Sequence, residues 1–138
     1  MILVRWHKLN LYKNMKRTYD LDATGEKLGR LATKVATLLM GKNDSDFQKN
    51  VIADVEVNIN NISKLNISNK KMEQKEYSRY SGYPGGRKVQ KMKTVVAKKG
   101  YAELMKKAVR GMLPANKLRP ELMKKLIIIE NEKVKVKK

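Results

Sequence analysis

Few side chains in this sequence could do catalytic or metal chemistry. His7 is the only histidine and there is no cysteine, so a Ser–His pair, a thiolate nucleophile and a Cys or His metal site all lack partners. The close acidic pairs are Asp20 with Asp22 and Asp44 with Asp46. Two carboxylates fall short of the ligand set of a calcium loop, so we interpret Asp44 and Asp46 as part of a polar loop. We therefore expect no catalysis, no metal, no cofactor and no small-molecule substrate.

The turn at residues 25–29 is a candidate phosphate site. Gly25-Glu26-Lys27-Leu28-Gly29 follows a predicted strand and opens a predicted helix, where backbone N–H groups can bind an anion. It lacks the Gly-Lys-Ser/Thr of a P-loop and the third glycine of the dinucleotide fingerprint. The turn is therefore a weak signal for a nucleotide enzyme, but it remains a candidate contact for an RNA phosphate.

Residues 79–93 combine cations, aromatic rings and glycines. Cations bind the phosphates of RNA, aromatic rings stack on its unpaired bases, and glycines let the backbone approach closely. The alternative interpretation is a solvated basic loop whose tyrosines pack on the domain, and we favour RNA binding over it. The cations are Arg79, Arg87, Lys88, Lys91 and Lys93, the nearby rings are Tyr77, Tyr80 and Tyr83, and the glycines are Gly82, Gly85 and Gly86.

The charge balance supports a nucleic-acid partner. Lysine and arginine number 32 against 13 aspartates and glutamates, which gives a formal net charge of +19. Such an excess repels itself unless a polyanion neutralises it, and nucleic acid also gains from counterion release. A membrane is the main competitor, but the chain has no glycine after Met1 for myristoylation, no cysteine for prenylation and no apolar run near the ~20 residues of a span. We expect no membrane partner.

The two ends of the chain read as basic extensions of one domain at residues 16–130. Residues 1–15 form a predicted basic arm and residues 131–138 a basic tail. We interpret the arm as a retained extension, and the alternatives are an organelle transit peptide or a true start at Met15. The lack of cysteine suits a reducing compartment. We expect a cytoplasmic protein, with an organelle as the alternative.

The hydrophobic pattern predicts strands that alternate with helices. Strands are expected at 18–22, 55–59 and 127–129, with a further short one around Leu65 and Ile67. Helices are expected at 28–39, ended by Gly41, at 101–112, ended by Pro114, and at 119–126. Residues 42–54 read as a polar loop, and residues 69–92 read as a long functional loop because they show no periodicity. This order favours a three-layer α/β arrangement around a small sheet.

Four blocks of residues resemble one family, the universal large-subunit ribosomal protein L-thirteen in its bacterial and organellar form. They occur in the family's order and spacing and cover most of residues 16–127. The blocks are Asp22-Ala23-Thr24-Gly25 with Leu28-Gly29-Arg30-Leu31-Ala32-Thr33, Gly41-Lys42, Arg79-Tyr80-Ser81-Gly82-Tyr83-Pro84-Gly85-Gly86, and Ala108-Val109-Arg110-Gly111-Met112-Leu113-Pro114 with Lys125-Leu126 beyond.

The resemblance implies a fold, a partner and a set of contacts. The fold would be a three-layer α/β/α domain with a small, mainly parallel sheet. The partners would be large-subunit (23S-type) rRNA and neighbouring ribosomal proteins, with an early role in subunit assembly. Gly111 would be a position where close approach of RNA or backbone excludes a side chain. The expected RNA-binding residues are Lys27, Arg30, Lys42, Arg79, Tyr80, Ser81, Gly82, Tyr83, Pro84, Gly85, Gly86, Arg87, Lys88, Lys91, Arg110, Gly111, Met112 and Lys117.

Two other functions are kept as alternatives. The first is an RNA-binding regulator of mRNA translation that acts outside the ribosome, which co-sedimentation with large subunits would distinguish from a ribosomal protein. The second is a nucleotide-using enzyme on a Rossmann-like scaffold. The sequence lacks the phosphate fingerprint, the paired acid and base and the metal ligands that such an enzyme needs.

Overall fold

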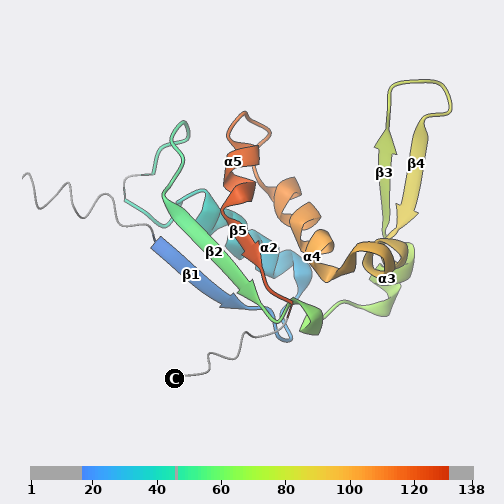
Figure 1. The fold of residues 1–138 in the computed structure, drawn as a ribbon, viewed down its shortest axis with the longest axis horizontal. Coiled ribbons are helices and arrows are strands. Elements are labelled where there is room, and N and C mark those ends of the chain that lie inside the picture. Colours follow the sequence, from blue (N-terminus) through green and yellow to red (C-terminus); the bar gives the residue numbers. More distant parts are fainter. Residues whose placement is uncertain (1–16, 46, 131–138) are drawn as a thin grey trace, which may run out of the picture.

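The computed structural model describes residues 17–45 and 47–130, and the predicted arm (1–15) and tail (131–138) lie outside these residues. The described chain forms an α/β domain with a separate hairpin (Figure 1). Its elements in order are β1 (Arg17–Asp22), α2 (Leu28–Leu39), β2 (Val55–Asn60), the 3-10 turn η1 (Ile62–Lys64), α3 (Asn69–Gln74), β3 (Glu76–Tyr80), β4 (Arg87–Lys91), α4 (Met92–Met112), α5 (Arg119–Lys124) and β5 (Leu126–Ile128).

The main sheet has the order β1-β2-β5 and is parallel throughout. Val55, Val57 and Ile59 of the central strand are buried and alternate with half-buried polar residues, so β2 presents one apolar face. Helices α2 and α4 pack together over the core that this face contributes to. The predicted α/β class and small parallel sheet are confirmed, and the described residues supply two of the predicted layers, the sheet and the helices on its apolar face.

Helix α2 follows the 3.6-residue period of its apolar residues. Its buried side chains are Leu28, Leu31, Ala32, Val35, Ala36 and Leu39. The helix ends in a Schellman motif at Gly41, which has a φ of +70°. The Gly41 N–H donates to the Leu38 carbonyl at 2.9 Å and the Lys42 N–H to the Thr37 carbonyl at 3.1 Å. This confirms the predicted helix and its glycine stop.

Two sequence predictions about the middle of the chain are wrong. The stretch around Leu65 and Ile67 is not a strand, because it follows η1 and pairs only through an isolated bridge between Lys27 and Asn66. Residues 69–92 are not one long loop, because they contain α3 and the antiparallel pair β3–β4. Only residues 81–86 are a loop, at the tip of this hairpin. The two strands carry polar residues on both exposed faces, so no alternation of apolar residues marked them.

Helix α4 is longer than predicted and is broken at Gly100. This residue has φ 74° and ψ 178°, which divides α4 into two helical segments. The predicted helix at 101–112 corresponds to the second segment. The first segment buries Met92 and Val95 and was not predicted. The predictions for α5 and β5 agree with the structure to within two residues.

Candidate nucleic-acid interface

The hairpin β3–β4 carries most of the predicted RNA-binding residues and stands away from the body of the domain (Figure 1). Its register places Arg79 directly opposite Lys88, and Tyr80 directly opposite Arg87. Because side chains alternate between the faces of a strand, Arg79 and Lys88 share one face and Tyr80 and Arg87 the other. Like charges directly opposite each other destabilise an antiparallel pair. An anion between Arg79 and Lys88 would relieve this repulsion.

The hairpin tip is shaped by its glycines. The Gly86 N–H donates to the Tyr83 carbonyl at 2.9 Å across Pro84 and Gly85, and Gly85 has a φ of +71°. This is the signature of a type II turn, with proline second and glycine third. A Cβ on Gly86 would lie 2.0 Å from the Ser81 Oγ and 3.0 Å from the Tyr83 carbonyl oxygen, so any larger residue there would have to displace the Ser81 side chain and crowd the turn.

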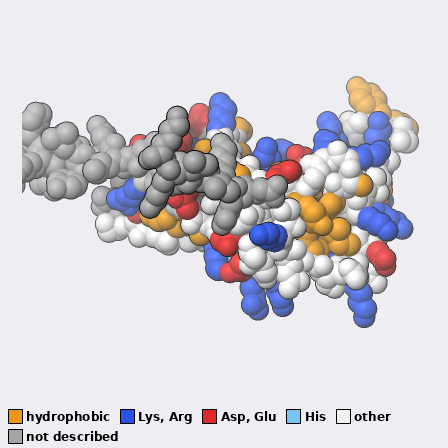
Figure 2. All heavy atoms as spheres, turned by 60° about the horizontal axis from the view of Figure 1, so that its bottom comes forward, with side chains coloured by type: hydrophobic (Ala, Val, Ile, Leu, Met, Phe, Trp, Pro, Cys, Tyr) orange, Lys and Arg blue, Asp and Glu red, His pale blue; other side chains and the backbone are white. Residues whose placement is uncertain are grey.

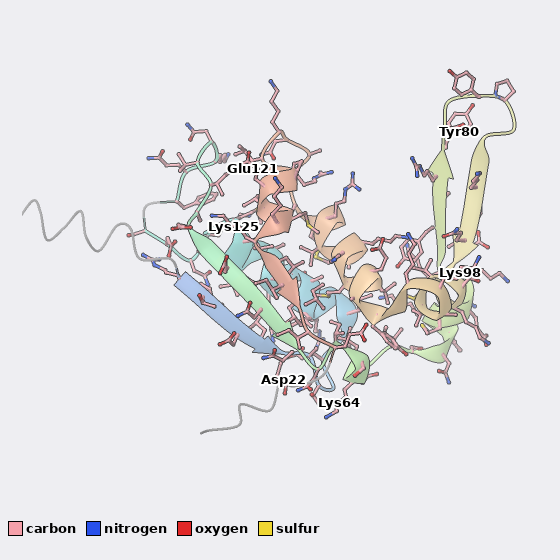
Figure 3. The ribbon with its side chains drawn as sticks, in the orientation of Figure 1. Asp22, Lys64, Tyr80, Lys98, Glu121 and Lys125 are labelled. Carbon is pink, nitrogen blue, oxygen red and sulfur yellow. The ribbon has the colours of Figure 1, made fainter. Side chains whose placement is uncertain are left out.

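The closed tip holds two tyrosine rings in solvent. Tyr80 is 65% exposed and Tyr83 is 76% exposed, so both rings are open to a partner (Figure 3 labels Tyr80). Figure 2 shows hydrophobic side chains at this end of the molecule with Lys and Arg side chains beside them. Rings and cations in this arrangement suit unpaired bases and phosphates.

Tyr77 fixes the base of the hairpin instead of facing a partner. It is half-buried and packs against the core. The Nζ atoms of Lys107 and Lys75 lie 5.0 Å and 6.0 Å from the centre of its ring, within the range of cation–π attraction. Burial raises the pKa of the Tyr77 hydroxyl. The Met92 N–H donates to the Lys75 carbonyl at 2.8 Å and closes the base of the hairpin.

A groove between α4 and α5 forms a second basic region, with a volume of about 460 Å³. Arg110 is the one predicted site residue in it. Its lining residues are Glu103, Lys106, Lys107, Arg110, Arg119, Pro120 and Met123. Lys107 also lies over Tyr77, so the groove adjoins the base of the hairpin. Nothing in the sequence assigned Lys106, Lys107 or Arg119 to a site, since only the packing of α5 on α4 brings Arg119 beside the two lysines.

Gly111 and Met112 lie at the end of α4, near α2. The Thr33 hydroxyl donates to the Met112 Sδ at 3.4 Å, so Met112 contacts α2 as well as being 41% exposed. Arg30 is exposed one turn before Thr33 and so belongs to the same part of the surface. A Cβ on Gly111 would meet no atom within 4 Å. The protein itself therefore leaves room for a side chain at Gly111.

The structure does not bring the other predicted residues into the hairpin. Lys27 precedes α2 and Lys42 follows it, so they lie at opposite ends of that helix. Lys117 lies in the connection between α4 and α5. All three side chains are exposed. The candidate interface therefore has several separate basic regions, of which the hairpin and the groove are the most organised.

The turn at residues 25–29 is closed by the protein's own hydrogen bonds. The Gly25 N–H donates to the Lys64 carbonyl at 3.1 Å and the Glu26 N–H to the Ala23 carbonyl at 3.2 Å. These two donors are therefore not available to a phosphate.

The carboxylate of Asp22 holds this turn in place. It accepts hydrogen bonds from the Thr24 N–H at 3.0 Å, the Thr24 hydroxyl at 2.8 Å and the Asn61 amide at 3.2 Å. The Thr24 N–H is the largest cause that lowers the Asp22 pKa, with Lys64, labelled beside it in Figure 3, among the smaller ones. Asp22 thus has a structural role here.

Within residues 17–45 and 47–130, none of the ion pairs involves a cation of the hairpin. The pairs join Arg17 to Asp44, Lys34 to Glu26 and Lys125 to Asp54. In the same residues there is no group of three or more His, Asp or Glu side chains that could hold a metal. No described helix is both long and apolar enough to cross a membrane.

Comparison with known proteins identifies close relatives. The sequence profile of the family described as Ribosomal protein L13 matches residues 16–135. A Thermus thermophilus protein named large ribosomal subunit protein uL13 is 45% identical over 106 residues, which cover 77% of this chain and 75% of that protein. The uL13 protein of Chlorobium phaeobacteroides is 42% identical over 111 residues, 80% of this chain and 73% of its own. A uL13c protein of Gracilaria tenuistipitata is 39% identical over 116 residues, 84% of this chain and 80% of its own. These relatives are ribosomal proteins and not enzymes, as predicted for this chain.

Proposed function

Because this chain belongs to the ribosomal protein L13 family, we propose that it is a structural constituent of the large ribosomal subunit that binds large-subunit rRNA. The observation that carries the proposal is the hairpin, where Arg79 and Lys88 face each other across two strands with no acidic partner among the described residues. The protein is then located on the ribosome, with rRNA and neighbouring ribosomal proteins as partners.

Binding would work by charge neutralisation and shape fit. Arg79 and Lys88 are held at one register on paired strands, so the RNA phosphates gain two cations without ordering a loop. Tyr80 and Tyr83 offer flat surfaces for unpaired bases beside these cations. Phosphate contacts fix register and carry little sequence information, so we expect recognition of RNA shape more than of sequence.

The early assembly role that the family resemblance implies is supported by the spread of the basic regions over the domain. The hairpin, the groove and the residues at the two ends of α2 belong to different elements of the domain. RNA segments that approach one another repel through their phosphates, and a protein that binds several of them at once offsets this repulsion. A chain built in this way stabilises the folded arrangement of rRNA.

Binding to purified rRNA tests the proposal. The full chain is expected to bind protein-free large-subunit rRNA more tightly than small-subunit rRNA, and the logarithm of the binding constant should fall steeply with the logarithm of salt concentration because several phosphates are neutralised. Filter binding over a salt series measures both. In cells, most of the chain should sediment with large subunits. Equal binding of the two rRNAs, a flat salt dependence or a protein that stays at the top of the gradient would each contradict the proposal.

Substitutions at Gly111 should separate stability from binding. Gly111→Ala is expected to stabilise the free protein by about 1 kcal/mol, because alanine favours the helix and its Cβ meets no atom. If RNA approaches this end of α4, the same change should weaken rRNA binding, and Gly111→Leu should weaken it by at least about tenfold, or 1.4 kcal/mol. Thermal unfolding and filter binding measure the two effects. Unchanged rRNA binding by Gly111→Leu would exclude a close approach at Gly111.

A further inference from the structure

The groove between α4 and α5 differs in chemistry from the hairpin. Pro120 and Met123 give it apolar lining, and positive charge comes from the lining residues Lys106, Lys107, Arg110 and Arg119. Glu103 adds one carboxylate, so the groove keeps a net positive charge. Its volume of about 460 Å³ lies within the range of small-ligand pockets. A lining that combines apolar and cationic side chains fits a ligand that joins a flat apolar body to an anion.

Arg119 is fixed in this groove by the protein backbone. Its Nε donates to the Pro114 carbonyl at 2.9 Å and its Nη2 to the Leu113 carbonyl at 2.9 Å. These two bonds fix the orientation of the guanidinium, which lines the groove beside Pro120 and Met123. An arginine plane of this kind can stack on an unpaired base. Because the side chain is already ordered, stacking on it costs little further entropy.

We propose that this groove binds a single unpaired nucleotide of RNA. The base stacks on the Arg119 plane and contacts Pro120 and Met123, while the flanking phosphates lie against Lys106, Lys107 and Arg110. The inference rests on the proposed function, because the nucleotide belongs to the RNA that the hairpin also contacts. Lys107, which lies over Tyr77 and lines the groove, connects the two regions. A paired nucleotide cannot enter, since its base remains stacked in the duplex.

The test compares two RNA hairpins that differ by one nucleotide. One carries a single unpaired cytidine in its stem, and the other has this cytidine deleted. The full chain is expected to bind the first at least about fivefold more tightly, the lower end of the effect of stacking one base on a side chain. Arg119→Lys keeps the charge but loses the plane, and should abolish this preference. Lys49→Gln removes a charge outside the groove, so it should change the binding of both RNAs by the same factor and keep the preference.

A second measurement needs no variant. With ¹³C-labelled methionine methyl groups, saturation of the wild-type chain by the unpaired-cytidine hairpin should shift the Met123 methyl resonance upfield, because a base ring lies over it, and leave that of Met40 in α2's C-cap unchanged. Equal affinity for the two RNAs, or a Met123 resonance that does not move, would overturn the inference. The same Met123 shift on adding polyglutamate would also overturn it, since the groove would then respond to charge alone. Continued binding of large-subunit rRNA in those cases would leave the proposed function standing.

Discussion

Replacing Arg79 and Lys88 together by glutamine is expected to weaken rRNA binding by on the order of tens of fold at ~0.1 M salt. Each lost phosphate contact lowers the slope of log K against log salt by roughly 0.7–0.9, so each contributes a little under tenfold at ~0.1 M relative to ~1 M salt. The same change should make the free hairpin slightly more stable. The two cations face each other directly across the strands, and removing such a repulsion contributes about 0.2–1 kcal/mol. Binding and stability should therefore change in opposite directions.

A matched control separates position from net charge. The pair Lys34→Gln with Lys49→Gln also removes two charges, but Lys34 already pairs with Glu26 and neither residue lies in the hairpin. This control should lower the salt slope much less than the hairpin pair does. Filter binding across a salt series and thermal unfolding give both quantities. If the two double variants lose the same affinity, the hairpin contributes only net charge, and its assignment to the RNA interface is wrong.

The sheet and α2 could be predicted because the spacing of their apolar residues follows which side chains are buried. Val55, Val57 and Ile59 alternate along β2 because one face of the strand is buried, and the apolar residues of α2 recur at helical spacing for the same reason. Gly41 marked the helix end because only glycine adopts its positive φ without strain. In each case a local requirement leaves a trace in the sequence.

The hairpin was predicted as a functional segment but not as a pair of strands. Its cations, tyrosines and glycines pointed to RNA, and its turn carried the Pro84-Gly85 signature. Both faces of its strands are exposed, so their sequences show no two-residue alternation of apolar and polar residues. Only Tyr77 of the hairpin packs on the body of the domain, and a single buried residue cannot show the periodicity of a strand.

The groove could not be predicted because it depends on contacts distant in the sequence. Arg119 is oriented by the carbonyls of Leu113 and Pro114, and this requires the chain to turn back between α4 and α5. Lys106 and Lys107 look like ordinary solvent-facing helix residues until α5 packs beside them. The first segment of α4 was missed for a different reason, since Met92 and Val95 are its only buried residues and two residues do not establish a helical period.

Gly41→Ala is expected to lower the free energy of unfolding by about 2–5 kcal/mol. A left-handed backbone costs a residue with a Cβ roughly 1–2 kcal/mol, and overfilling a packed site costs about 1–3 kcal/mol more. Both costs apply at Gly41, where φ is +70° and a Cβ would lie 2.6 Å from the Ala53 Cβ. Ala53 cannot rotate its Cβ away, so the backbone between α2 and β2 has to shift. Chemical denaturation followed by circular dichroism measures the loss.

Gly25→Ala is the matched control, because Gly25 has the same φ of +70° but a Cβ there would meet no atom within 4 Å. It should cost only the roughly 1–2 kcal/mol of backbone strain. The difference between the two variants therefore isolates the close approach of Gly41 to Ala53. Gly41 joins α2 to the loop before the central strand, so this difference also measures how tightly the sheet and its helix are held together. Equal destabilisation by the two substitutions would mean that the loop yields and that the α2–β2 connection is not rigidly packed.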